Sequence, residues 1–385
     1  MAPKWTHNPI SQKLGAPVAL SKPTAFAWEG DKTQHVVYVG NDGNVHELWF
    51  RKGGMNPQWQ YGGALNVKSN APTATGTPSG FTWESDKTQH IVYRGSDSEI
   101  HELWFKHGMM GKAEWTYGGV LNKKVGAPSA AGDPLGYTWD EDHSMHVIYR
   151  GVDNNVHEVW FNKGMGGGEW KYGGPINATV GAPPAVGEPS GFSWEHDKTQ
   201  HILYRAADNN VHELWFKHGM MGKAVWTYGG ALNAKAGAPP AASDAMGFAW
   251  EADKTQHVIY RGMDNQTHEL WFNKGMMGKG EWKYGGAISA KTGAPLADGM
   301  PWGFAWEGDH TMHIVFRGQD SNIHELWFSK GMTGGAWKYG AALNRMANGP
   351  VAGSDPVGFA WEDDNSQHVV YRGQDNQIHE LWFKK

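Results

Sequence analysis

At residues 101–105 the chain reads His-Glu-Leu-Trp-Phe, and this pentad occurs seven times, with one substitution in the third copy. Successive copies lie 55 or 56 residues apart, because they begin at His46, His101, His157, His212, His268, His324 and His379. A period in this range is typical of repeat architectures, in which each repeat is one supersecondary unit. We therefore interpret residues 1–385 as one domain of seven units of about 55 residues.

The remainder of the unit predicts four short strands. In the second copy, apolar runs rich in aromatic and β-branched residues occupy residues 80–84, 89–95, 100–105 and 115–119, and Gly, Asp, Asn, Ser or Pro separates them. Such runs are typical of strands joined by turns. No stretch shows sustained helical periodicity. An aspartate that we expect to form a turn through its own backbone recurs between the second and third runs, at Asp42, Asp97, Asp153, Asp208, Asp264, Asp320 and Asp375.

The two ends of the chain decide between a ring and an open array. The last copy ends at Lys385, directly after its third strand, and lacks a fourth. Residues 5–10 and 15–17 align with 115–120 and 126–128, so the N-terminus offers the missing strand. This exchange requires the first and last units to be neighbours. The sequence therefore predicts an all-β fold, a closed seven-bladed β-propeller of four-stranded blades, in preference to an open solenoid.

Composition excludes several classes of function. The chain has no cysteine, which rules out a disulfide framework and a thiolate zinc site. A formal charge of -5 argues against nucleic acid as the main partner. The first residues lack the apolar core of a signal peptide, and no run is long enough to span a bilayer. We expect a soluble protein that is cytoplasmic on synthesis. If it leaves the cell, we expect it to do so without a general secretory signal peptide.

Tryptophan is the strongest indication of a binding function, because 21 of the 22 tryptophans fall into three seven-fold sets. The indole rings can fill the wedges between blades as core. Three large rings in each wedge are crowded, however, so we expect at least one set to line pockets between blades. Outside blade 1, the candidate contacts are Trp83, Trp139, Trp194, Trp250, Trp306 and Trp361 of the first strands, Trp104, Trp160, Trp215, Trp271, Trp327 and Trp382 of the third, and Trp115, Trp170, Trp226, Trp282, Trp337 and Trp5 of the fourth.

An indole face beside polar groups suits a sugar, whose C–H face stacks on the ring while its hydroxyls are hydrogen-bonded. Blade 1 has Val39 where the other blades have arginine, so its site is expected to be weak or lost. The polar candidates are Arg94, Arg150, Arg205, Arg261, Arg317 and Arg372, together with Glu102, Glu158, Glu213, Glu269, Glu325 and Glu380.

A second set of histidines, exemplified by His90, lies eleven residues before the pentad histidines. These histidines and the pentad glutamates are equally consistent with buried structural pairs, since buried polar groups need hydrogen-bond partners. Seven identical metal sites are much less plausible than seven such pairs, so no metal and no cofactor is expected.

Catalysis is disfavoured because the blades are near copies of one another. Carboxylates such as Glu84 and Asp86 recur, but no blade carries a unique set of acid, base and nucleophile, as a propeller glycosidase requires. The enzyme hypothesis would be revived by turnover of an aryl glycoside that is lost on changing one acidic residue in a single blade. The runner-up hypothesis is a scaffold that binds a protein on one face of the ring, and the propeller glycosidase ranks third.

The motifs at residues 358–362, 367–373 and 378–383 resemble those of the PLL-like lectin family of Photorhabdus, and the resemblance covers the whole chain. It implies a propeller lectin that binds L-fucose, and in some members O-methylated sugars, in shallow sites between blades, and that forms homo-oligomers. The expected partners are therefore fucosylated glycans. Departures from the repeat are Val39 for Arg, Ala206 for Gly, Phe316 for Tyr, Met145 and Met312 for Gln, and Asn348-Gly349-Pro350 for Gly-Ala-Pro.

Overall fold

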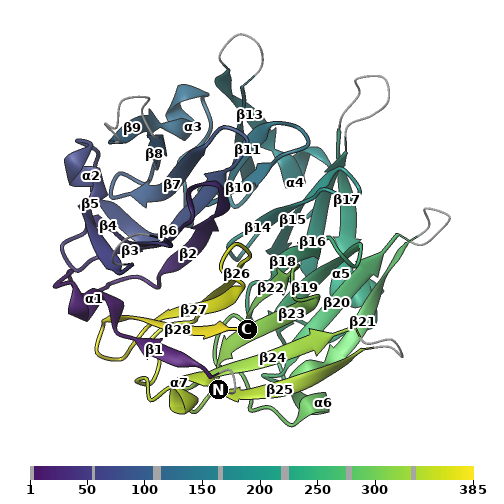
Figure 1. Cartoon of the computed structure of the whole chain (residues 1–385). Coiled ribbons are helices and arrows are strands. Elements are labelled where there is room, and N and C mark those ends of the chain that lie inside the picture. Colours follow the sequence, from purple (N-terminus) through teal and green to yellow (C-terminus); the bar gives the residue numbers. More distant parts are fainter. Residues whose placement is uncertain are drawn as a thin grey trace.

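A computed structural model of the chain describes residues 4–53, 57–106, 114–163, 168–217, 225–274, 280–330 and 335–385. Within these residues, the strands form seven four-stranded antiparallel sheets that follow one another around a ring (Figure 1). Each sheet is one blade, and in blades 1 to 6 the chain runs from the innermost to the outermost strand. The predicted seven-bladed propeller is confirmed.

The first four blades follow the sequence order. Their strands are β2 Thr24–Trp28, β3 Thr33–Val39, β4 Val45–Arg51 and β5 Trp59–Ala64 in blade 1, β6 Ala74–Trp83, β7 Thr88–Gly95, β8 Ile100–Lys106 and β9 Trp115–Val120 in blade 2, β10 Leu135–Trp139, β11 Ser144–Arg150, β12 Val156–Asn162 and β13 Glu169–Pro175 in blade 3, and β14 Ser190–Trp194, β15 Thr199–Arg205, β16 Val211–Lys217 and β17 Val225–Ala231 in blade 4.

The last three blades complete the ring. Their strands are β18 Met246–Trp250, β19 Thr255–Arg261, β20 Thr267–Asn273 and β21 Glu281–Ala287 in blade 5, β22 Trp302–Trp306, β23 Thr311–Arg317, β24 Ile323–Ser329 and β25 Ala336–Ala342 in blade 6, and β26 Val357–Trp361, β27 Ser366–Arg372, β28 Ile378–Lys384 and β1 Thr6–Asn8 in blade 7.

Closure of the ring follows from two sets of contacts. Strand β1 pairs antiparallel with β28, with Thr6 opposite Trp382 and Asn8 opposite Glu380. In Figure 1 the purple β1 lies beside the yellow β28. The innermost strands also contact one another in a closed circuit that includes the pair β2 and β26. The N-terminal strand therefore completes the last blade, as the alignment of the chain ends predicted.

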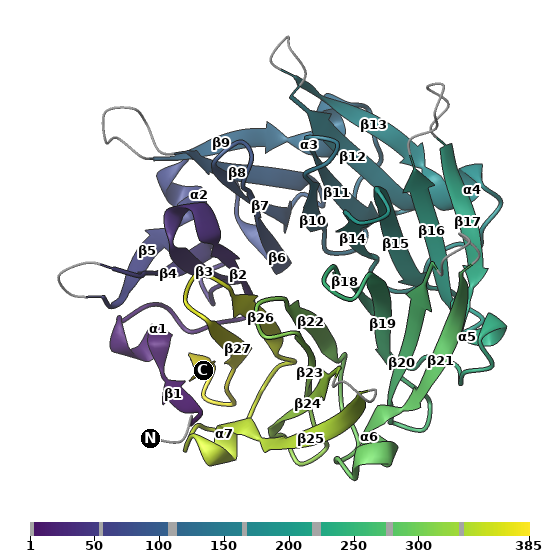
Figure 2. The same cartoon turned by 45° about the vertical axis from the view of Figure 1, so that its right-hand side comes forward.

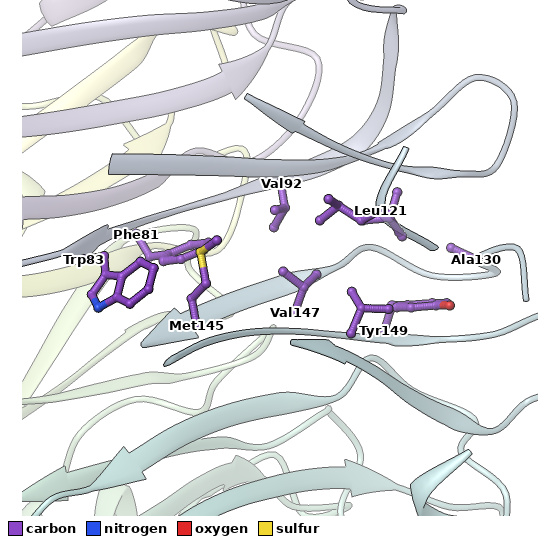
Figure 3. Close-up of a cluster of buried hydrophobic side chains, with 10 residues drawn as sticks. Phe81, Trp83, Val92, Leu121, Ala130, Met145, Val147 and Tyr149 are labelled. Carbon is purple, nitrogen blue, oxygen red and sulfur yellow. The ribbon is translucent and has the colours of Figure 1, made fainter. Parts of the chain in front are cut away.

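The core lies between the blades. In blade 2, for example, the second strand β7 is buried on both faces, whereas the outermost strand β9 is only partly buried. One cluster joins Phe81, Trp83 and Val92 of blade 2 to Met145 and Val147 of blade 3 (Figure 3). Apolar residues on both faces of the second strands thus hold neighbouring sheets together, and each blade depends on its neighbours for burial of its core.

Short helices carry the chain from the fourth strand of one blade toward the next. In the described residues they are α1 Ile10–Lys13, α2 Leu65–Lys68, α3 Leu121–Lys124, α4 Ile176–Thr179, α5 Leu232–Lys235, α6 Ile288–Thr292 and α7 Leu343–Met346, with a 3₁₀ turn η1 at Glu29–Asp31. Most are a single turn, and such short helices leave no helical periodicity in the sequence. Figure 2 shows α3, α4, α5 and α6 at the outside of the ring. None of the helices in the described ranges has the length and apolar character needed to cross a bilayer.

A circuit of carboxylates links the innermost strands. The Glu84 side chain accepts backbone N–H bonds from Glu29 and Gly30 of blade 1, at 2.9 and 3.1 Å. Burial raises the pKa of Glu84, although these two bonds partly oppose the shift. The same contact recurs at Glu29, Glu195, Glu251, Glu307 and Glu362. The Trp-Glu dipeptide therefore helps to join neighbouring blades at these six interfaces, whereas blade 3 has Trp139-Asp140 in its place.

Candidate functional site: cavities between neighbouring blades

Two cavities open between neighbouring blades at equivalent places in the repeat. One, of about 660 Å³, lies between blades 2 and 3, and the other, of about 940 Å³, lies between blades 5 and 6. The first is lined by Trp83, His90, Glu102 and Trp104 of blade 2 and, among others, by Trp170 of blade 3. Their volumes and their aromatic and polar linings are those of small-molecule sites.

A buried hydrogen-bonded chain fixes the polar side of each cavity. His90 Nδ1 lies 2.9 Å from Glu102 Oε1, and His90 Nε2 lies 2.8 Å from the Thr88 hydroxyl. Since a carboxylate only accepts, Nδ1–H donates to Glu102, and a neutral ring then accepts the hydroxyl proton of Thr88 at Nε2. The sequence was equally consistent with buried His–Glu pairs and with ligand contacts, and the structure shows that the pairs are formed. The pair recurs in all seven blades, including His257 with Glu269.

A bulge in the fourth strand makes room for the glutamate. The register between β8 and β9 shifts between Glu102 and Leu103, so that Gly118 is the extra residue. A Cβ atom on Gly118 would lie 2.2 Å from Glu102 Oε2, and Gly119 has a φ of +95°. Glycine is required at both positions, because one has no space for a side chain and the other has a backbone conformation that other residues rarely adopt.

The first-strand tryptophans lie in the core. Trp83 is only 2% exposed, and its ring packs edge-on against Phe161 of blade 3 at a centroid distance of 6.0 Å. Equivalent contacts join blade 1 to 2, 3 to 4, 4 to 5, 5 to 6 and 7 to 1. Their main observed role is to fill the wedge between blades, together with the pentad phenylalanines. At the two cavities, Trp83 and Trp250 also form part of the wall.

The third- and fourth-strand tryptophans are mostly half-buried and keep surface for a ligand. Trp104 and Trp170 both line the cavity between blades 2 and 3. Trp271 and Trp337 take their places between blades 5 and 6. In blades 3, 5 and 6, however, a lysine lies over the third-strand ring, with Lys283 Nζ at 4.8 Å from the centre of Trp271. The closing Trp5 differs, since it is only 6% exposed.

The arginines lie at the other end of the second strand. Arg94 is four residues beyond His90 in β7, a separation of roughly 13 Å in an extended strand. It bonds the carboxylate of Asp133, with N···O distances of 3.2 and 3.3 Å. Arg205 and Arg317 likewise pair with a carboxylate at the start of the next blade, Asp244 and Asp355, while Arg261 and Arg372 bond backbone carbonyls. Neither of the two cavities brings an arginine to its wall.

The pentad histidines lie near the start of the third strands, at the same end of the blades as the arginines. His101 Nε2 donates to Asp97 at 3.0 Å, and Nδ1 accepts the hydroxyl proton of Tyr117 at 2.7 Å. The turn aspartate also accepts the backbone N–H two residues on, as predicted. In blade 3, burial opposes ionisation of Asp153, but hydrogen bonds from His157 and Asn155 outweigh it and lower the pKa of Asp153 to about 2. These groups are structural.

Sequence reasoning considered Asp86 only as a carboxylate for catalysis and did not predict a charged rim at the cavities. Asp86 lines the cavity between blades 2 and 3 and forms ion pairs with Lys106 of its own blade and Lys163 of the next. Asp253 pairs with Lys330 at the equivalent place. The recurring Asp-Lys-Thr-Gln-His motif, which contains these aspartates, was the available signal. Among the described residues, no group of three or more His, Asp and Glu side chains is arranged to hold a metal ion.

Comparison with known proteins gives the fold its context. No family model matches the chain, and no curated protein matches it. The BP39L lectin of Burkholderia pseudomallei is similar in structure, with a TM-score of 0.67 and 12% identity over 96% of this chain and 98% of its own. A fungal lectin of Aleuria aurantia, described as a six-bladed β-propeller with a novel fucose recognition mode, has a TM-score of 0.52 and 16% identity over 84% and 95%.

The SapL1 lectin, solved in complex with α-methyl fucoside, has a TM-score of 0.50 and 16% identity, covering 85% of this chain and 96% of its own. At these identities the likeness shows a shared fold. These neighbours are described as lectins, and the Aleuria aurantia lectin is described as fucose-specific. This chain is thus a seven-bladed β-propeller whose overall fold resembles that of these lectins.

Proposed function

We propose that the protein is a multivalent, non-catalytic lectin that binds L-fucose in shallow sites between neighbouring blades. The observation that supports this most is the pairing of half-buried indoles with a buried His–Glu couple at the wall of both cavities, as with Trp104, His90 and Glu102. Ring faces supply stacking for the C–H side of a pyranose, and carboxylate oxygens supply acceptors for its hydroxyls. The fucose lectins among the structural neighbours support the same choice of ligand.

Avidity supplies the strength that a shallow site lacks. A single monosaccharide in such a site is expected to bind with a Kd on the order of millimolar to micromolar. Sites around one ring, or around a homo-oligomer, engage several glycan ends at once, which raises the apparent affinity roughly a hundredfold or more. The functional consequence is cross-linking of glycan-bearing surfaces.

Calorimetry tests the proposal. Titration with L-fucose, an O-methylated fucose and a panel of other monosaccharides at millimolar concentration is expected to show saturable heat for the first two. Absence of saturable heat across the whole panel would remove the lectin hypothesis. A useful control is the same titration after unfolding in guanidinium chloride, in which the blades and their cavities are lost.

A protein scaffold is the second candidate, and one surface favours it. Exposed apolar side chains gather at the linkers and at the turns between second and third strands, where they are Leu20, Val152, Val186, Met263, Leu296 and Val351. Protein-binding surfaces are marked by exposed apolar groups that lie close enough to form a continuous patch. This candidate predicts a single protein partner whose binding is unaffected by free sugar, and it fails if sugar abolishes that binding.

A further inference from the structure

The two cavities coincide with the two interfaces at which methionine replaces glutamine. Met145 lines the cavity between blades 2 and 3, and Met312 lines the one between blades 5 and 6. The second strands of the other five blades carry Gln34, Gln89, Gln200, Gln256 and Gln367 at this position. We call the two sets Met interfaces and Gln interfaces.

We propose that the Met interfaces are the principal sugar sites and that they select a pyranose carrying an apolar methyl substituent, such as a 6-deoxyhexose. This inference rests on the lectin function proposed above. It assigns binding to two sites three blades apart and nearly opposite across the ring, and it makes Met145 and Met312 specificity-determining residues.

The Gln interface between blades 7 and 1, which also contains Asn8 of the closing strand, has a fully bonded glutamate. Between blades 7 and 1, Gln34 Nε2 donates to Glu380 Oε1 at 3.3 Å. His368, Asn8 and Trp59 also donate to this carboxylate, at 2.8, 3.2 and 3.0 Å. A carboxylate has about four lone-pair sites. Glu380 is therefore saturated by protein donors and has no acceptor left for a ligand.

The Met interfaces leave acceptor capacity on the glutamate. Gln interfaces away from the closing strand do so too, since among the described residues Glu47 and Glu213 receive two side-chain hydrogen bonds each and Glu158 receives one. The Met interfaces are therefore set apart by the side chain that faces this carboxylate. A thioether has no proton to donate, so Met145 cannot replace the glutamine amide. Within the described part of the chain, Glu102 receives one side-chain hydrogen bond, from His90, and Glu269 receives two, from His257 and Trp337. Both carboxylates are buried at the cavity wall. A sugar hydroxyl that donates to either one completes its hydrogen bonding.

The same substitution makes the adjacent wall apolar. Met145 reaches from β11 toward Phe81 and Trp83 of the preceding blade (Figure 3). Phe161 and Trp170 close the cavity from blade 3. A methyl group placed on this wall gains apolar contact, whereas a hydroxymethyl group there loses its hydrogen bonds to water. A pocket discriminates such analogues by roughly tenfold or more.

The two Met interfaces also differ from one another. Lys283 Nζ lies over the Trp271 ring at 4.8 Å and occupies part of its stacking face, whereas the residue paired with Trp104 is Thr116. A sugar at the second interface must displace the lysine or share the ring with it. The site between blades 2 and 3 is therefore expected to bind the sugar more tightly.

Methionine-methyl NMR tests the inference directly. In protein labelled with ¹³C-methyl methionine, the Met145 and Met312 signals are assigned by their loss in Met145→Gln and Met312→Gln, substitutions that restore the residue found in the other five blades. Titration with methyl α-L-fucoside is expected to shift both signals in a saturable manner. Two analogues test the methyl group: D-arabinose has the fucose ring without it, and L-galactose carries a hydroxymethyl group instead. Both are expected to bind with an affinity at least roughly tenfold lower.

The controls separate failure of this inference from failure of the lectin function. Met145→Gln with Met312→Gln should weaken fucoside binding about tenfold, while Met263→Gln, at a 54% exposed residue, should leave it unchanged. Calorimetric fucoside binding without shifts of the two signals, or undiminished in the double variant, overturns the assignment and leaves the lectin proposal standing. Equal affinity for fucose and D-arabinose overturns the methyl selectivity. No binding of any sugar overturns both.

Discussion

Replacing Trp5 by alanine tests ring closure through the strand that closes the last blade. Trp5 is 6% exposed and shares a buried cluster with Phe304 of blade 6 and Leu381 of blade 7, and its ring contacts Phe383 at 5.7 Å. Truncation of a buried tryptophan to alanine costs about 3–5 kcal/mol. With an unfolding entropy of about 2.1 cal/mol/K per residue over 385 residues, we expect Tm to fall by roughly 4–6 °C.

The matched control is Trp115→Ala, at the same place in blade 2. Strand β9 follows the other strands of its blade directly in the chain, whereas β1 continues into blade 1 and pairs with β28 of blade 7 through noncovalent contacts, so the two variants differ in what can detach. We expect trypsin to cut after Lys13 faster in Trp5→Ala than in wild type, and Trp115→Ala to resist cleavage there. Thermal unfolding and timed proteolysis followed by mass spectrometry measure both effects. A Trp5→Ala variant within 1 °C of wild type and uncut at Lys13 would refute the argument for closure.

Three further substitutions test particular contacts. Gly118→Ala places a methyl group 2.2 Å from Glu102 Oε2, so it should abolish fucoside binding between blades 2 and 3 while binding between blades 5 and 6 persists; NMR titration showing both sites intact contradicts this. Burial raises the pKa of Glu188 to about 7 from 4.5, so the protein loses stability as the pH rises through this interval. Glu188→Gln should therefore raise Tm at pH 8 but not at pH 4, and equal shifts at both would be inconsistent. The pKa of Asp153 is about 2, so its contribution to stability is present above about pH 4 and disappears as the pH falls to 2. Asp153→Asn should lower Tm at pH 7 with a difference that vanishes near pH 2, and a difference that persists there counts against the His157 contact.

The fold could be predicted because repetition supplies redundant evidence. Seven pentads fix the period, and the alignment of Trp5 with Trp115 requires that the first and last units be neighbours. Strand periodicity also predicts which residues share a face, since successive side chains alternate. The pairing of His90 with Glu102 satisfies this alternation across two strands, yet sequence alone could not distinguish such a pair from ligand contacts.

The position of the site along each strand could not be predicted in the same way. His90 and Arg94 lie on the same face of one strand, so a face-based argument groups them, although the structure separates them and pairs Arg94 with Asp133. Neighbouring blades approach and diverge along their length, and this spacing depends on packing that only the assembled ring defines. The Met145 departure was visible in the sequence, but its importance depends on the neighbouring Glu102 of another blade. The candidate sugar contacts therefore stay predictions until a ligand is bound.

A crystal structure of the protein soaked with methyl α-L-fucoside tests the central claim most directly. We predict sugar density between blades 2 and 3 and between blades 5 and 6, with the fucose methyl group against Met145 and Met312 and a hydroxyl within hydrogen-bond distance of Glu102 and Glu269. Sugar found only at the linkers and the turns between second and third strands, or no sugar between any two blades at saturating concentration, would contradict the account.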